Sequence, residues 1–296
     1  GRVRDENGMK DDYRNYLFEH YLSVVNRYQP KVFVFENVPG LLSAMPDGTP
    51  IIQLIESGFS GIGYEIVDDV KKYAKVDASD YGVPQNRERL IILGIRKDVC
   101  DDVQSILHKF YLEILPKYKS KKKTTVAEAI GDLPKILPII DSKDLKSRIG
   151  YSEPSCRTTW HKARRHSLRD VEIYQMLAND IKSGRNEYVD SKSLSDLYEE
   201  KVGAKSPIHR YHVLRADEPS TTIISHLDRD GNRFIHYDPE QGRDITPREA
   251  ARIQSFDDDF DFIGNQTDTY IMIGNAVPPL LAKCVGLAVS EVLDIL

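Results

Sequence analysis

Apolar positions in the first hundred residues follow two patterns, helical spacing and short continuous runs. Helical spacing predicts helices over 13–28 and 50–57, and the continuous runs predict strands over 32–35, 64–70 and 90–95. The first of these runs, Val32–Phe35, is wholly apolar, which is typical of a strand buried on both faces of a parallel sheet. Strands that alternate with helices indicate an α/β protein, and we expect a Rossmann-like, doubly wound sheet.

The pattern changes after about residue 135. Short isolated strands and polar loops follow, with one predicted helix over 168–181. Two further runs, 221–227 and 233–237, flank an Asp-Gly pair at 230–231, and this predicts a β-hairpin. We expect this region to form a smaller, mixed α+β domain inserted into the first one.

The last fifty residues return to helical spacing. Helices are predicted over 246–254, which begins with a Thr cap and a Pro at its first helical position, and over 278–293. The predicted domains are therefore 1–140, 141–245 and 246–296, and the third segment returns to the fold of the first.

Composition narrows the class of protein. Of 296 residues, 40% are hydrophobic and 29% charged, which is typical of a folded domain. No apolar run approaches the ~18 residues of a membrane span, so we expect no membrane association. Three cysteines without a CxxC pair indicate reduced thiols in a cytoplasm and speak against a zinc site.

Charge is distributed unevenly along the chain. The net charge is −5, yet residues 115–165 hold 13 Lys and Arg against five Asp and Glu. Such a basic block is typical of a surface that binds a polyanion, although its lysine run at 117–123 is explained equally well as a solvated linker. The second part of the block surrounds Trp160, and arginines beside an aromatic side chain favour nucleic-acid contact. His161 and His166 lack further ligands at metal-binding spacing, so we expect no metal there, but DNA contact or packing.

Two motifs flank predicted strands. ENVPG, residues 36–40, places Glu36 directly after the first strand, where ligands bind in open parallel sheets. QNRER, residues 85–89, precedes the strand at 90–95, and its alternating Gln85, Arg87 and Arg89 share one side of an extended chain. The alternatives are a surface carboxylate at position 36 and a salt-bridged strand edge that involves Glu88.

Two more motifs lie near the C-terminus. REAARIQSF, residues 248–256, places Arg248 and Arg252 on one face of the capped helix, where a structural role is favoured. IGNAVPP, residues 273–279, is predicted to be a tight loop that leads into the last helix. Its Asn275 is expected either to cap that helix or to lie beside a small ligand.

The order and spacing of these four motifs closely resemble those of cytosine-C5 DNA methyltransferases from restriction–modification systems and phages, over nearly the whole chain. The resemblance implies that a cytosine is flipped out of duplex DNA, that a cysteine thiolate attacks C6, and that S-adenosylmethionine donates a methyl group to C5. It further implies that Glu36 hydrogen-bonds N3 and the exocyclic amine, that Arg89 binds O2, and that Arg87 supports the site. Asn275 and Val277 would close the S-adenosylmethionine pocket.

The same resemblance assigns the region between QNRER and REAARIQSF to target recognition on double-stranded DNA, in a bacterial or phage cytoplasm. Base edges would be read through the major groove. The residues expected to contact DNA are Arg157, Lys162, Arg164, Arg165, Thr221 and Thr222. Arg248 and Arg252 would brace this domain.

Two pieces that the resemblance implies do not occur in these 296 residues, namely a glycine-rich cofactor segment and a Pro-Cys-Gln nucleophile motif. Cys100, Cys156 and Cys284 lie at other positions and are not expected to replace the nucleophile. We therefore expect an incomplete sheet that lacks its N-terminal strands, and a chain that is inactive without an N-terminal segment or subunit. A cognate restriction endonuclease is a further possible partner. The alternative is a non-catalytic DNA-binding relative, and transfer to RNA is less favoured.

Overall fold

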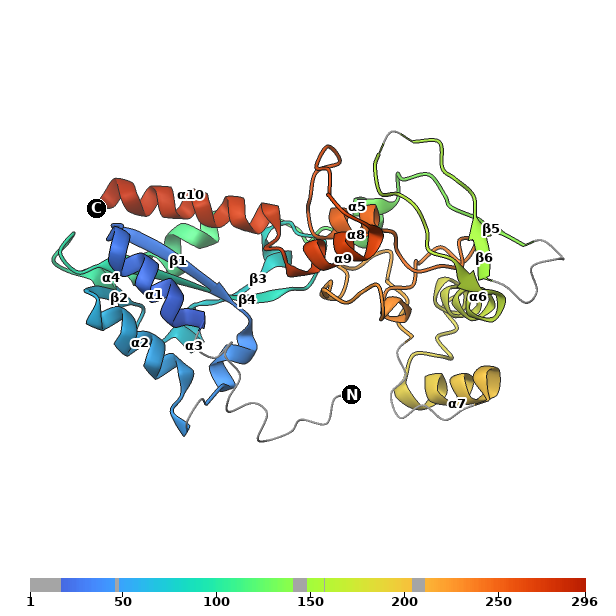
Figure 1. Cartoon of the computed structure of the whole chain (residues 1–296), viewed down its shortest axis with the longest axis horizontal. Coiled ribbons are helices and arrows are strands. Elements are labelled where there is room, and N and C mark those ends of the chain that lie inside the picture. The colour runs from blue at the N-terminus through green and yellow to red at the C-terminus, as the bar shows by residue number, and fades with distance from the viewer. Residues whose placement is uncertain (1–16, 46–47, 141–147, 157, 204–210) are drawn as a thin grey trace. The chain divides into compact units, whose positions relative to one another are not determined.

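The computed structural model of the chain describes residues 17–45, 48–140, 148–156, 158–203 and 211–296 (Figure 1). Contacts divide the chain into two units. The first unit consists of Gly1–Gly82, Arg87–Lys121 and Leu280–Leu296. The second unit consists of Val83–Asn86 and Lys122–Pro279. These limits differ from the domain limits expected from the sequence, and the assignment of 141–245 to target recognition stays a prediction.

Helices and strands of the first unit alternate as the sequence predicts. The helices are α1 (Leu17–Tyr28), η2 (Pro39–Ser43), α2 (Ile51–Gly61), α3 (Val70–Tyr73), η4 (Ala78–Tyr81), α4 (Val103–Lys109), the π-helical turn η5 (Phe110–Ile114), η6 (Leu115–Tyr118) and α10 (Pro279–Ile295). The strands are β1 (Val32–Asn37), β2 (Tyr64–Ile66), β3 (Lys75–Asp77) and β4 (Glu88–Arg96).

The strand β4 is the centre of a four-stranded sheet. It pairs with β1 along one edge and with β2 and β3 along the other, and all three pairings are antiparallel. The parallel arrangement predicted from the sequence is therefore wrong for the described strands. A continuous apolar run shows that both faces of a strand are buried, as Leu90–Leu93 are here, but it does not fix the direction of the neighbouring strand.

Helices cover both faces of this sheet (Figure 1). On one face, Phe59 of α2 stacks on Phe33 of β1 with ring centroids 4.2 Å apart. The Phe33 ring lies over Gly94 of β4, where a Cβ would come within 2.1 Å of it, so only glycine fits at that position. Tyr111 of η5 binds the main chain of β4, because its Oη accepts from Leu93 N and donates to Ile91 O, both at 2.9 Å.

The second unit is built mainly from helices and ordered loops. Its elements are α5 (Val126–Ile130), β5 (Pro138–Ile139), β6 (Arg148–Tyr151), β7 (His166–Ser167), α6 (Leu168–Lys182), α7 (Ser191–Val202), η7 (Gly231–Arg233), α8 (Pro247–Ile253) and α9 (Gln266–Asn275). The three strands form a small antiparallel sheet in the order β5-β6-β7. One apolar core lies around α5, α8 and α9, and another around α6 and α7.

The predicted hairpin at 221–237 is wrong. Its second half pairs elsewhere, because Leu214 N donates to Ile235 O and Ile235 N donates to His212 O, at 2.9 and 3.0 Å. Its first half is bound by the QNRER motif instead, as described below. The Asp-Gly pair lies at the start of η7, a short 3-10 helix, where Asp230 is the N-cap.

A buried ion pair anchors the start of α8. Thr246 caps this helix, and Glu249 completes the capping box by accepting from Thr246 N at 2.6 Å. Both carboxylate oxygens of Glu249 also accept from Arg243, each at 2.7 Å, and both side chains are almost fully buried. The Arg243 guanidinium is the main attraction that holds the pKa of Glu249 at about 2, against the effect of burial. Burial lowers the pKa of the neighbouring His236 to about 4.

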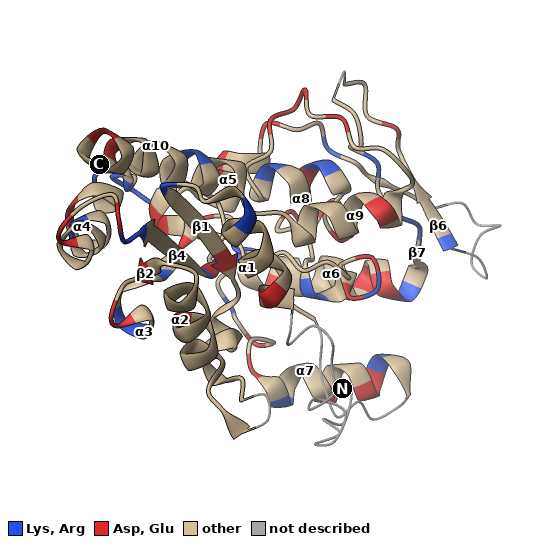
Figure 2. Cartoon of the chain, turned by 60° about the vertical axis from the view of Figure 1, so that its left-hand side comes forward, with Lys and Arg blue, Asp and Glu red and all other residues tan. Residues whose placement is uncertain are grey.

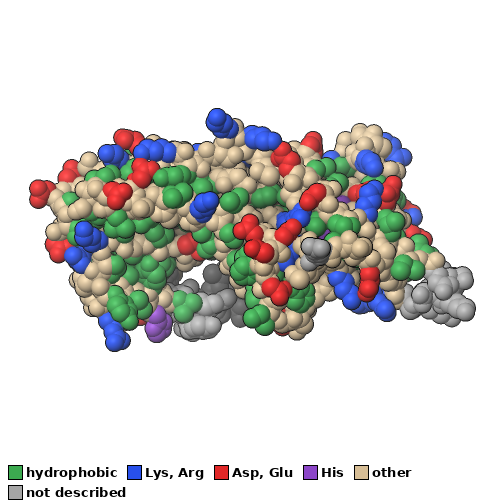
Figure 3. Space-filling view, turned by 90° about the horizontal axis from the view of Figure 1, so that it is seen from above, with side chains coloured by type: hydrophobic (Ala, Val, Ile, Leu, Met, Phe, Trp, Pro, Cys, Tyr) green, Lys and Arg blue, Asp and Glu red, His purple; other side chains and the backbone are tan. Residues whose placement is uncertain are grey.

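The helical stretch Gln266–Ile295 is long and apolar enough to cross a membrane by length and composition alone. It consists, however, of two helices, α9 with 10 residues and α10 with 17, and each is shorter than the ~20 residues that a bilayer requires. Apolar and charged side chains are interspersed on the face that carries α10 (Figure 3). This stretch is therefore weak evidence for a membrane span.

Candidate functional site

Glu36 and Arg89 form an ion pair at one end of the sheet of the first unit. Arg89 Nε lies 2.9 Å from Glu36 Oε1, and the two side chains are 12% and 31% exposed. The antiparallel register explains this contact, because it pairs Asn37 at the end of β1 with Leu90 near the start of β4. The carboxylate of the ENVPG motif and the last arginine of QNRER are thereby brought together. Glu88, the alternative partner expected from the sequence, pairs with Lys75 at 2.7 Å instead.

Arg87 lies beside this pair and is 2% exposed. Its pKa is lowered to about 10, mainly by burial and then by the positive charge of Arg89, while Glu36 opposes the shift. Burial also lowers the pKa of Arg89, and Glu36 opposes that shift too. The structure therefore brings the three predicted catalytic residues into one electrostatic group. A half-exposed carboxylate held by a desolvated arginine can bind a polar ring that offers both donors and acceptors.

Two fully buried glutamines, Gln85 and Gln254, connect the start of the QNRER motif to the rest of the second unit, and the sequence did not predict them to form a pair. Gln85 Nε2 donates to Ile253 O at 3.2 Å and to the side-chain oxygen of Gln254. Gln254 Nε2 in turn donates to Ile273 O at 3.0 Å and to Ala276 O at 2.8 Å. Three of the four motifs are thus joined by side-chain amides. A fully buried glutamine must find partners, and the sequence offered no signal beyond the presence of one glutamine in each of the two motifs.

Thr221 and Thr222 lie in a segment that the same network fixes. Gln85 Oε1 accepts from Ile223 N at 2.8 Å, and Thr222 Oγ1 donates to Asn86 O at 2.7 Å. On its other side the segment meets Gly274, where a Cβ would lie 2.4 Å from the main chain at 224–225. Gly274 therefore has to be glycine for α9 to approach this closely.

Asn275 and Val277 lie at the end of α9, not in a loop before the last helix. The helix α9 was not predicted from the sequence, and Asn275 is its last residue. The side chain of Asn275 is exposed and that of Val277 is half-buried, so both are accessible to a ligand. Whether they hold a cofactor stays a prediction.

Arg248 is fully buried and satisfies four acceptors in the second unit. Its guanidinium donates to Thr159 O and Oγ1, Asp257 O and Phe260 O, each at 2.9 Å. Arg252 donates to both carboxylate oxygens of Asp258 and to Asp132. These contacts agree with the structural role expected for both arginines.

The basic residues around Trp160 have different environments. Arg157 lies outside the described residues. Lys162 and Arg165 are exposed, whereas Arg164 turns inward and donates to Asp244 and to Asp228 O. His161 and His166 are buried and bind Thr246 and Asp244, which favours packing over DNA contact for both.

The exposed members of this basic cluster border a hollow of about 710 Å³ in the second unit. Arg148, Lys162, Arg165, Arg169 and Arg229 are among the residues that line it. Figure 2 marks the basic residues around β6, β7 and the start of α6. We refer to these five residues as the basic rim. Five cations around one hollow form a surface suited to phosphate groups.

The three cysteines are only partly exposed. The pKa of Cys100 is raised by burial and by Asp102 and Asp101, in agreement with the effect expected from the sequence. Burial also raises the pKa of Cys284. Both shifts reduce the thiolate fraction at neutral pH and thus nucleophilic reactivity.

Comparisons with known proteins agree with the motifs. A sequence model of the C-5 cytosine-specific DNA methylase family matches residues 3–291. The type II methyltransferase M.Bpa9945I of Bacillus paralicheniformis is 33% identical over 99% of this chain and 67% of its own length. M.XorII of Xanthomonas oryzae pv. oryzae is 32% identical over 93% of this chain and 62% of its own length. The chain thus spans about two thirds of these relatives.

A solved structure of a prophage-encoded E. coli protein, described as a DNA modification methyltransferase, superposes with a TM-score of 0.55 at 24% identity. The superposition covers 96% of this chain and 76% of the E. coli chain. This likeness supports a mixed α/β methyltransferase fold. The match of the family over nearly the whole chain, together with relatives above 30% identity, shows that the chain belongs to the C-5 cytosine-specific DNA methylase family.

Proposed function

We propose that this chain supplies the cytosine-binding part of an enzyme that transfers a methyl group to C5 of cytosine in double-stranded DNA. The observation that carries the proposal is the ion pair between Glu36 and Arg89 at 2.9 Å, next to the buried Arg87. A cytosine ring offers an exocyclic amine donor, the N3 acceptor and the O2 acceptor on one edge. Glu36 and Arg89 together present the complementary groups.

Glu36 holds a proton at N3 and accepts from the exocyclic amine, while Arg89 donates to O2. Protonation at N3 draws electrons from the ring and favours addition of a thiolate at C6, because negative charge that develops on the ring is neutralised. Arg87 adds a second positive charge nearby. The target cytosine has to leave the base stack, because this edge and C6 are inaccessible inside a duplex.

S-adenosylmethionine supplies the methyl group in this proposal. Asn275 and Val277 fit a place beside it, because both side chains are accessible and the main chain next to them is fixed by Gln254 through Ala276 O. Asn275 offers an amide donor and acceptor, and Val277 offers an apolar surface.

Recognition of double-stranded DNA is assigned to the second unit. The basic rim binds backbone phosphates, with Lys162 and Arg165 as the residues first identified from the sequence. Thr221 and Thr222 are proposed to lie near the flipped base, as the resemblance implies. Arg164 contributes to DNA binding only indirectly, since Asp244 and Asp228 O engage its guanidinium. Replacing residues 150–243 by the corresponding region of a relative should change the methylated sequence, and retention of the old target would contradict this assignment.

The nucleophile is proposed to come from outside these 296 residues, on an N-terminal segment or a separate subunit. The raised pKa values of Cys100 and Cys284 support this, as does the absence of a Pro-Cys-Gln motif from the sequence. A bacterial or phage cytoplasm, and an endonuclease with the same target, are proposed from the names of the relatives as type II methyltransferases.

The test is methyl transfer to duplex DNA by the protein isolated from its source, with Glu36→Gln as the variant. We expect a rate at least about 100-fold lower, with DNA affinity nearly unchanged, because a general acid contributes on the order of 10²–10⁴-fold. Glu88→Gln is the matched control, since Glu88 is a half-exposed carboxylate on β4, directly before Arg89, that pairs with Lys75. Equal rates for Glu36→Gln and the control would refute the role of Glu36. Duplex binding without transfer by the unaltered protein would favour a non-catalytic relative.

A further inference from the structure

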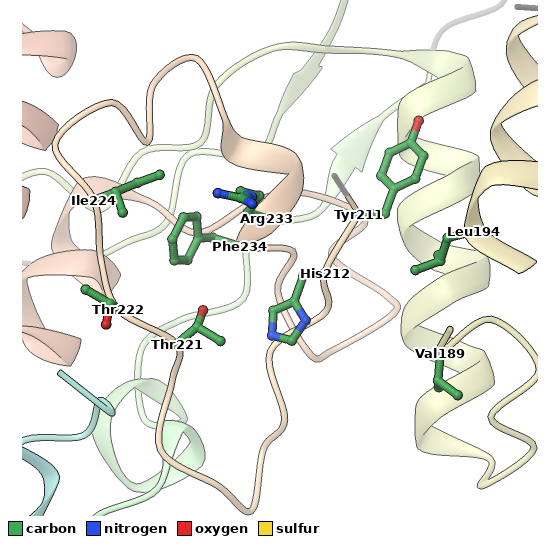
Figure 4. A pocket seen from close by; sticks show the side chains of 9 residues that line it. All are labelled: Val189, Leu194, Tyr211, His212, Thr221, Thr222, Ile224, Arg233 and Phe234. Carbon is green, nitrogen blue, oxygen red and sulfur yellow. The ribbon is translucent and has the colours of Figure 1, made fainter. Parts of the chain in front are cut away.

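A second hollow in the second unit, of about 470 Å³, is lined by residues of which only Thr221 and Thr222 have been given a role so far (Figure 4). Its lining residues are Val189, Leu194, Tyr211, His212, Thr221, Thr222, Ile224, Arg233 and Phe234. They supply apolar walls, three hydroxyl groups, an imidazole and one guanidinium, and no carboxylate among the described residues. Apolar walls with a few polar groups are typical of a ligand site, and the volume lies in the range for one.

The two strongest donors of this hollow, His212 and Arg233, lie on main chain that is held in place. His212 N donates to Asn232 O at 2.7 Å, and Ile235 N donates to His212 O at 3.0 Å. The neighbours of the two residues are buried, with Tyr211, Val213 and Phe234 at most 4% exposed. Both side chains are exposed. The two side chains therefore start from main chain that is fixed and remain accessible to a ligand.

The charge of Arg233 is not neutralised within the described part of the chain, where no carboxylate lies within ion-pair distance of its guanidinium. The pKa of His212 is lowered by partial desolvation and by the positive charges of Arg215 and Arg233. The imidazole is therefore neutral at pH 7 and can either donate or accept. Figure 4 shows His212 between Thr221 and the apolar side chains Val189 and Leu194.

We propose that Arg233, with His212 beside it, is a specificity-determining residue that reads a guanine in the target sequence. A guanidinium matches the O6 and N7 acceptors of guanine with two parallel hydrogen bonds, which is the commonest base-specific contact of arginine. The adjacent segment carries Thr221 and Thr222, and Thr222 is tied to Asn86 of the QNRER motif at 2.7 Å. A base read here would thus lie next to the segment that the proposed function places near the flipped cytosine. The inference rests on that proposed function.

The test compares Arg233→Ala with the unaltered full-length protein on a set of duplexes in which each position of the methylated site is varied in turn. We expect discrimination between guanine and the other bases to fall by about tenfold or more at one position, and to persist at the others. Arg229→Ala is the matched control, because Arg229 lies four residues earlier, is exposed and borders the other hollow. It should weaken binding to all duplexes alike.

A uniform loss of affinity in Arg233→Ala would identify a phosphate contact and overturn the inference, as would an unchanged sequence preference. Competition binding with the same duplexes reports discrimination without requiring methyl transfer. A failure of catalysis in the unaltered protein would therefore count against the proposed function, and the binding data would still decide the role of Arg233. Circular dichroism of the variant excludes misfolding as the cause of either result.

Discussion

Replacing one of the two buried glutamines, Gln85 and Gln254, should lower the free energy of unfolding by a measurable amount. Gln254→Leu keeps the volume and burial of the side chain but removes its amide. Two donations are lost, to Ile273 O at 3.0 Å and Ala276 O at 2.8 Å, and Gln85 Nε2 loses its acceptor on Gln254. Gln85 Nε2 keeps its bond to Ile253 O at 3.2 Å. A hydrogen bond lost from a buried group costs ~1–3 kcal/mol, so the two lost donations together cost roughly 2–6 kcal/mol.

This cost is measured as a shift of the thermal or urea midpoint. For a domain of 150–250 residues, 1 kcal/mol corresponds to roughly 2–4 °C, so we expect the Tm of Gln254→Leu to fall by roughly 4–24 °C. The matched control is Gln266→Leu, since Gln266 donates to Lys162 O at 3.0 Å from an exposed position. Surface substitutions usually change stability by no more than ~0.5 kcal/mol. Equal shifts in the two variants would refute the conclusion that amides of the motif glutamines join the motifs.

Further predictions concern the second unit. Gly274→Ala should cost ~1–3 kcal/mol in urea unfolding, because its Cβ would lie 2.4 Å from the main chain at 224–225, whereas Gly286→Ala, with nothing within 4 Å, should be neutral or slightly stabilising. Glu249→Gln should cost ~3–5 kcal/mol, since it leaves a buried guanidinium without its counter-charge, and a cost below 1 kcal/mol would contradict the buried pair. Stability should fall as pH is lowered from about 6.5, because the unfolded chain then protonates His236, whose pKa in the folded chain is about 4. Below about pH 4.5 the unfolded chain also protonates Glu249, whose pKa in the folded chain is about 2, so stability falls further. Chemical denaturation at pH 7.5, 6 and 5 checks this, and a midpoint that rises toward pH 5 would be inconsistent with it.

Local signals in the sequence predicted five of the ten α-helices of the described residues. The Thr cap and Pro at the start of α8, and the spacing in α1, α2, α6 and α10, are confirmed by the structure. The helix α9 was missed because its apolar residues show little amphipathic bias. Its capping box, Asn265 with Asp268, was the signal that could have revealed it.

Pairing between distant segments could not be predicted in the same way. The apolar run of β4 was recognised as a strand, but strand direction depends on partners outside the run. The hairpin prediction failed because the segment before its turn binds Gln85 and Asn86, and the segment after it pairs with 212–214. The preference of an Asp-Gly pair for a tight turn is local, and here the contacts with distant segments outweigh it.

In the candidate site, too, the residues could be predicted from local motifs, but their contacts with distant segments could not. Glu36, Arg87 and Arg89 were identified from their motifs, and the antiparallel register of β1 and β4 then explains why two of them meet. Arg164 was expected on a DNA surface but turns inward, because Asp244, 80 residues away in sequence, accepts from it. Charge runs indicate a class of partner, whereas the orientation of a single arginine depends on its tertiary contacts.

The most direct test of the central claim is the identity of the methylated product. Full-length protein isolated from its source is incubated with duplex DNA and methyl-labelled S-adenosylmethionine, and the DNA is digested to nucleosides for mass spectrometry. The account predicts label in 5-methylcytosine, formed by the unaltered protein and the Glu88→Gln control and lost in Glu36→Gln and Arg89→Ala. Label on an exocyclic nitrogen, or 5-methylcytosine formed at equal rates by Glu36→Gln, would contradict the assignment of the Glu36–Arg89 pair to the target cytosine.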